Sequence, residues 1–83
     1  MYYCVFFNHT TANRVKNMVD NDLNYVAITQ APKAISGSCS YALKFDDAKL
    51  NQIKNVIEKN QFRFKGIYKE IVLENGEKQY RQI

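Results

Sequence analysis

A run of aromatic and β-branched residues opens this 83-residue chain and constrains its fold more than any other stretch. Residues 2–7 read Tyr-Tyr-Cys-Val-Phe-Phe, which favours a β-strand. Successive side chains of a strand point to opposite faces, and both faces here are apolar. One face carries Tyr2, Cys4 and Phe6, and the other carries Tyr3, Val5 and Phe7. A strand of this kind is usually central, so other elements must cover it on both sides.

Periodic patterns along the rest of the chain predict two helices and four more strands. Helix-capping residues at 8–11 and at Asp46–Asp47 each precede an apolar stripe at three-and-four spacing. The stripe of the first helix includes Met18, and Lys49 belongs to the solvated face of the second. The sequence Asn75-Gly76 predicts a type I′ hairpin turn near the end. In chain order, the predicted elements after the first strand are a helix from 8–11 to the polar turn 20–22, strands at 23–29 and 40–45, a helix from 46–47 to 60–61, and strands at 64–73 and 78–83.

This order of elements is β-α-β-β-α-β followed by one more hairpin strand. We therefore predict a single α+β domain over residues 1–83, a ferredoxin-like two-layer sandwich with an additional C-terminal strand. Both helices should cover one face of an antiparallel sheet, and the first and third strands should lie side by side in its centre. No run of about 18 apolar residues occurs, so we expect no membrane span.

The chain has two cysteines, and their positions predict different roles. No export signal is recognisable, so we expect a reducing cytoplasmic setting in which both thiols stay free. Cys4 lies in the middle of the first strand, where it is best explained as a small buried hydrophobe. Cys39 lies in the loop before the third strand, offset from Cys4 by roughly 13 Å along the strand. A disulfide needs Cα atoms within about 7 Å, so we expect no bridge.

Small residues surround Cys39 in the loop that begins at the chain's one proline, Pro32. They let the backbone turn tightly, and their N–H groups and hydroxyls can point at an anion. These residues are Ser36, Gly37, Ser38 and Ser40. Lys33 and the predicted helix start near Thr10 would add positive charge, which favours the nucleophilic thiolate. The alternative is a loop cysteine that performs no chemistry.

His9 is the only histidine, and it precedes the first helix. It could reach the same end of the sheet and act as a base for Cys39, or it could be a solvated residue ahead of the helix. No third group is identifiable, so we predict no hydrolytic triad. One histidine and two separated cysteines do not make a zinc spacing, and no phosphate-binding glycine loop occurs. We therefore expect no metal and no cofactor.

The net charge of +4 permits an anionic partner without requiring one. The lysines are spread along the chain, which is more typical of ordinary solvated faces. The central-strand aromatics leave an RNA-binding alternative open, although the usual RNA-binding strand motif is missing. These aromatics are Tyr2, Tyr3, Phe6, Phe7 and Tyr41. A second copy covering the apolar face that the helices leave open is the simpler explanation, so we expect a homo-oligomer and no nucleic acid.

The segment Ile35–Phe45, which reads ISGSCSYALKF, resembles the Ile-Ser-x-Ser-Cys-Gly-x-Ala-Leu-Arg-Phe core of a small bacterial selenium/sulfur carrier-like family, long known as DUF3343. Pro32-Lys33 is similar to that family's Pro-Arg. The opening strand with residues 8–12, and the segment 66–68, also resemble the family. The resemblance covers about residues 2–69 and leaves a hairpin at about 70–83 beyond it. Ser40 stands where the family usually has glycine.

The resemblance implies a carrier that holds a persulfide or perselenide on Cys39. Its partners would be a cysteine desulfurase-like donor and an unknown acceptor protein. Two alternatives remain open. One is a homodimerising interaction module without catalysis, and the other, less favoured by the residues, is an RNA-binding domain.

Overall fold

The computed structural model describes residues 1–19, 26–35 and 40–83. Within them, two helices and five strands follow in the predicted order of types. These elements are β1 (Tyr2–Phe6), α1 (His9–Val19), β2 (Ala27–Gln30), β3 (Tyr41–Phe45), α2 (Asp47–Asn60), β4 (Gly66–Val72) and β5 (Lys78–Gln82). Neither helix in the described ranges is long and apolar enough to cross a membrane.

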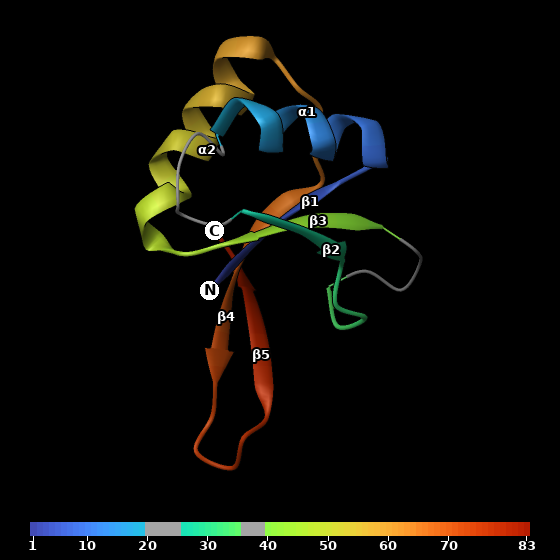
Figure 1. Cartoon of the computed structure of the whole chain (residues 1–83). Coiled ribbons are helices and arrows are strands. Elements are labelled where there is room, and N and C mark those ends of the chain that lie inside the picture. The colour runs from blue at the N-terminus through green and yellow to red at the C-terminus, as the bar shows by residue number, and fades with distance from the viewer. Residues whose placement is uncertain (20–25, 36–39) are drawn as a thin grey trace.

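The strands form one antiparallel sheet in the order β2-β3-β1-β4-β5 (Figure 1). The prediction that the first and third strands lie side by side is confirmed, since Phe6 pairs with Tyr41 and Cys4 with Leu43. On its other edge β1 pairs with β4, where Val5 lies opposite Gly66. The fifth strand extends this order beyond that of a simple βαββαβ unit.

Both helices lie on one face of the sheet (Figure 1). The core between the layers comprises Tyr2, Cys4, Phe6, Ala12, Val15, Val19, Val26, Leu43, Phe45, Ile53, Ile57 and Ile67. β1 contributes Tyr2, Cys4 and Phe6 to this core, because side chains alternate along a strand and its even-numbered residues face the helices. The apolar stripes of both helices supply the opposite side. The mixed α+β class, with two helices over an antiparallel sheet, is therefore confirmed.

The other face of the sheet is covered by the chain itself. Tyr3, Val5 and Ala42 are all buried there. Partly buried residues from the turn after β2 and from the β4–β5 hairpin pack against them. These residues are Ala31, Ile35, Tyr68 and Tyr80. The expectation of an open apolar face is wrong for these residues. The predicted homo-oligomer, which that face motivated, stays a prediction.

Hydrogen bonds to one carboxylate attach the hairpin to this face. Tyr3 and Tyr80 donate their hydroxyls to Glu70 Oε2 at 3.2 and 3.3 Å, and their rings meet edge to face. Burial and the charge of Glu70 both raise the pKa of each tyrosine. Both hydroxyls therefore remain protonated donors at neutral pH. The Lys78 ammonium lies 4.0 Å from the same carboxylate oxygen.

The predicted caps set the helix ends. Asn8 Oδ1 accepts from the Thr11 amide at 2.9 Å, and Asp46 Oδ1 accepts from the Ala48 amide at 3.0 Å. Each side chain satisfies a backbone donor that has no partner within its helix. Gln61, the residue after α2, has a left-handed φ of 56°, which ends the helix.

Two helix residues differ from the predicted faces. Met18, assigned to the apolar stripe of the first helix, is 41% exposed. Lys49, assigned to the solvated face of the second, is only 5% exposed. Its ammonium donates to the carbonyl of Val19, the last residue of α1, at 3.1 Å. A lysine stem can lie along apolar surface while its charged end reaches a helix terminus, which spacing alone does not reveal.

The predicted β4–β5 hairpin is confirmed, but its turn is not type I′. The Gly76 amide donates to the Leu73 carbonyl, and the Leu73 amide donates to the Glu77 carbonyl. A type I′ turn needs positive φ at both central residues. Among the described residues Gly76 has a φ of +86°, whereas Asn75 does not have positive φ. The bonds fit a three-residue loop that ends in a left-handed glycine.

Candidate functional site

The loop between β2 and β3 carries the predicted reactive cysteine. Cys39, with Ser36, Gly37 and Ser38, lies outside the described residues. The structure describes both flanks of this segment, residues 31–35 and Ser40. The end of β1 lies beside the start of β3, as expected, because Phe6 pairs with Tyr41. The loop therefore rejoins the sheet at the edge where α1 begins.

Ser40 is fixed at this edge by its backbone and its side chain. It is buried, with 3% of its surface exposed. Its carbonyl accepts from the Ala31 amide at 2.8 Å, and its hydroxyl oxygen accepts from the Lys65 ammonium at 2.9 Å. The hydroxyl at this position, where the resemblance expects glycine, thus contacts a cation directly.

Lys65 comes from the opposite side of β1. Its backbone amide donates to the Val5 carbonyl at 2.6 Å, just before β4 begins. Its side chain passes across the end of β1 to Ser40, and the ammonium lies 5.4 Å from the centre of the Phe7 ring. Lys65 was not among the predicted site residues. The pairing of β1 with β4, which the sequence analysis did not predict, brings residue 65 to the end of β1. The ferredoxin-like order of elements was the signal that could have found it.

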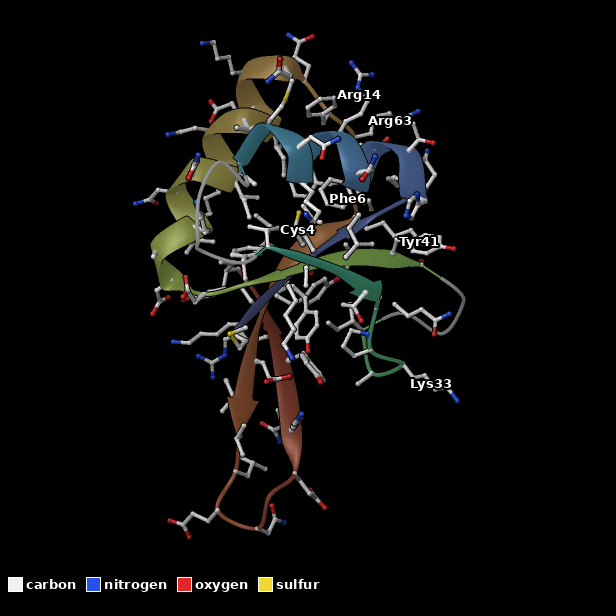
Figure 2. The ribbon with its side chains drawn as sticks, viewed as in Figure 1. Cys4, Phe6, Arg14, Lys33, Tyr41 and Arg63 are labelled. Atoms are coloured by element: carbon white, nitrogen blue, oxygen red, sulfur yellow. The ribbon has the colours of Figure 1, made fainter. Side chains whose placement is uncertain are left out.

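Lys33 and Thr10 occupy different sides of the sheet. Residues 32–35 form a turn in which the Ile35 amide donates to the Pro32 carbonyl at 2.9 Å. Ile35 packs on the face opposite the helices, and Figure 2 shows Lys33 pointing away from the body of the protein on that side. Thr10 lies in the first turn of α1, on the helix side. The structure does not bring these two predicted residues together.

His9 lies at the end of the sheet where β3 begins. Its ring meets the Tyr41 ring edge to face, with centroids 5.0 Å apart. Tyr41 directly follows Ser40 and is 39% exposed. His9 is itself exposed. The expectation that His9 reaches the loop's end of the sheet agrees with this contact, and its role as a base stays a prediction.

Cys4 is sealed in the core between the sheet and the helices (Figure 2). It has no exposed surface and pairs with Leu43 on one side and Ile67 on the other. Burial raises the pKa of its thiol to about 12. Cys4 is a free cysteine, and the prediction of a small buried hydrophobe is confirmed. A thiol in this state is neither accessible nor ionised at neutral pH.

Three of the five central-strand aromatics are too buried to stack bases. Tyr2, Tyr3 and Phe6 are all less than 10% exposed. Tyr2 and Phe6 face the helices, and Tyr3 lies beneath the hairpin. An RNA surface on these strands, left open by the sequence, is therefore wrong for these three residues.

Comparison with known proteins identifies one family. A family model described as "Putative Se/S carrier protein-like" matches residues 1–69. The matched span contains Cys39 and Lys65 and ends within β4, so β5 lies beyond it. No curated protein and no solved structure matches the chain.

Proposed function

This chain belongs to the family described as "Putative Se/S carrier protein-like", and from this membership we propose that it carries sulfur or selenium as a persulfide or perselenide on Cys39. The family name supports the carrier role in general terms. The burial of Cys4 is the observation that supports Cys39 as the carrier residue. The chain has two cysteines, and Cys4 is fully enclosed with a pKa of about 12.

Lys65 would favour the thiolate of Cys39. Its ammonium bonds to the hydroxyl of Ser40, which directly follows Cys39 in the sequence. A nearby cation lowers the pKa of a thiol because it stabilises the charged form. We therefore assign to Lys65 the electrostatic role that the sequence suggested for Lys33. The small residues 36–38 would supply N–H groups and hydroxyls to the bound anion.

The proposed chemistry is an exchange at sulfur. In loading, the Cys39 thiolate attacks the outer sulfur of a donor persulfide, and the donor's sulfur–sulfur bond breaks as its cysteine leaves as a thiolate. In delivery, an acceptor nucleophile attacks the outer sulfur on Cys39, and Cys39 leaves as the thiolate. Neither step consumes an oxidant. We infer a cysteine desulfurase-like donor, an unidentified acceptor and a reducing cytoplasmic setting.

The framework for this site is a ferredoxin-like sandwich. The strand order β2-β3-β1-β4 and the placement of both helices on one face support it. In this arrangement the central β1 ends between the starts of β3 and β4. That geometry supports a site to which the loop before β3 brings Cys39 and the segment before β4 brings Lys65.

The pH dependence of Cys39 alkylation tests the proposal. Native protein is treated with iodoacetamide across a pH series, and modification of Cys39 is followed by peptide mass spectrometry. We expect an apparent pKa below the value of about 8.5 of a free cysteine. In Lys65→Met the apparent pKa of Cys39 should rise, because the cation that stabilises the thiolate is lost. The rise should be only roughly half a unit, because solvent and salt partly screen an exposed ammonium. The matched control, Lys69→Met, removes an ammonium from β4 itself and should leave the pKa of Cys39 unchanged. A wild-type pKa of about 8.5 or higher would count against activation.

A further inference from the structure

A hollow of about 420 Å³ lies where the start of α1 meets the segment between α2 and β4. Its lining combines aromatic rings, amides, a hydroxyl and a guanidinium. The lining residues are Phe7, Asn8, Thr11, Gln61, Phe62 and Arg63. Phe7 is 59% exposed, although a phenylalanine gains most by burial. An exposed aromatic ring in the lining of a hollow is available for stacking.

Three cations lie in the lining of this hollow or against its aromatic rings. Arg63 lines it directly. The Arg14 guanidinium carbon lies 5.4 Å from the centre of the Phe62 ring, and the Lys65 ammonium lies 5.4 Å from that of Phe7. Figure 2 shows Arg14 and Arg63 at the same end of the molecule. We call these five residues, Phe7, Arg14, Phe62, Arg63 and Lys65, the basic aromatic patch.

The segments that build the patch contain no acidic residue. Residues 1–19 and 59–69 include neither aspartate nor glutamate, although the chain has eight acidic residues in all. The acidic residues of the described chain lie in α2, its cap and the β4–β5 hairpin. Glu58, just before the second segment, lines a neighbouring hollow with Phe62 and Lys65. Three cations against one carboxylate still leave the patch positively charged, which favours an anionic ligand.

We propose that the basic aromatic patch binds single-stranded RNA. Phosphates would contact Arg14, Arg63 and Lys65, and a base would stack on the exposed Phe7 ring. Cationic grooves interleaved with accessible aromatic rings are the usual means of holding single strands without reading their sequence. A stable protein interface needs about 800 Å² on each partner, which is far larger than a patch of five residues. The proposal does not require Cys39, although it shares Lys65 with the proposed carrier site.

This site shares only Phe7 with the five central-strand aromatics that the sequence suggested for RNA. The central-strand aromatics Tyr2, Tyr3 and Phe6 are buried. Phe7 directly follows Phe6, the last residue of β1, and its ring lies beside the Lys65 ammonium at the end of the sheet. The accessible ring and the cations are therefore at the end of the sheet and not on its face.

Fluorescence anisotropy with a fluorescein-labelled oligouridine of eight nucleotides tests the proposal. Binding should be measurable at 50 mM salt. If the three cations neutralise three phosphates, the logarithm of the binding constant should fall with the logarithm of salt concentration with a slope of about −2. The affinity should then drop roughly 18-fold between 50 and 200 mM salt. The absence of salt-sensitive binding at 50 mM would overturn the proposal.

Two variants with matched controls locate the site. Phe7→Ala should weaken binding at least about fivefold through lost stacking, whereas Val72→Ala, which also truncates an exposed hydrophobe, should not. Arg63→Gln should reduce the salt slope by about 0.7, and Arg81→Gln on the exposed β5 should leave it unchanged. Equal effects in a variant and its control would overturn the assignment. Tighter binding of an oligoglutamate of the same length would favour an acidic protein segment and would also overturn it.

Discussion

Cys4 should be inert to alkylation in the folded protein. In a Cys39→Ser variant it is the only thiol, and burial raises its pKa to about 12. At pH 8 about one Cys4 side chain in ten thousand is then ionised, against about a quarter for a free thiol of pKa 8.5. The thiolate population alone therefore slows the reaction by roughly three orders of magnitude. The absence of exposed surface at Cys4 slows it further, because the reagent has to wait for an opening of the core.

The assay follows the intact mass of Cys39→Ser during incubation with iodoacetamide at pH 8. The native variant should stay unmodified over the time in which free cysteine reacts completely, and the same variant in concentrated urea should react at once. Cys4→Ala, which retains Cys39, is the control and should react in the native state. If native Cys39→Ser were alkylated within about tenfold of the rate of free cysteine, the assignment of Cys4 to the closed core would be refuted.

Three further variants test the energetics of the fold. Because burial raises the pKa of Cys4 from 9.0 to about 12, its contribution to stability is complete below pH 9 and is lost between pH 9 and 12. The free energy of unfolding should therefore fall by up to about 1.4 kcal/mol per pH unit in this range. Cys4→Ala should remove this part of the pH dependence, measured by urea unfolding at several pH values. Asp46→Ala removes the cap of α2 and should lower the free energy of unfolding by about 1 kcal/mol, measured by urea unfolding at pH 7. Lys49→Met keeps the buried stem but removes the donor to the Val19 carbonyl, and should cost about 1–3 kcal/mol, whereas the exposed Lys54→Met should change stability by less than about 0.5 kcal/mol.

Local patterns in the sequence were sufficient to predict the elements and their order along the chain. The alternation in residues 2–7 identified β1 as central, and Asn8 and Asp46 marked the helix starts. Each of these signals acts within a few residues of the chain, so spacing and residue type determine it. The turn type at Gly76 was missed because two turns accept Asn-Gly, and the choice between them depends on how the flanking strands pair.

Contacts between distant segments could not be predicted in the same way. The hydrogen bond from Lys65 to Ser40 joins residues 25 positions apart and exists because β1 separates β3 from β4. Covering of the second face depends on Tyr80 reaching back over Tyr3. Sequence patterns placed positive charge at Lys33 because it is close to Cys39 in the chain. The structure places Lys65 at the start of β3 instead, and Lys33 on a turn that points away from the helix side.

Transfer of sulfur onto the protein tests the central proposal most directly. The reduced protein is incubated with a cysteine desulfurase and free cysteine, and its intact mass is measured before and after treatment with dithiothreitol. We expect a gain of one sulfur atom that dithiothreitol removes, present in wild type and Cys4→Ala and absent in Cys39→Ser. An equal gain in Cys39→Ser, or no gain in wild type while the desulfurase loads another thiol acceptor in parallel, would contradict it.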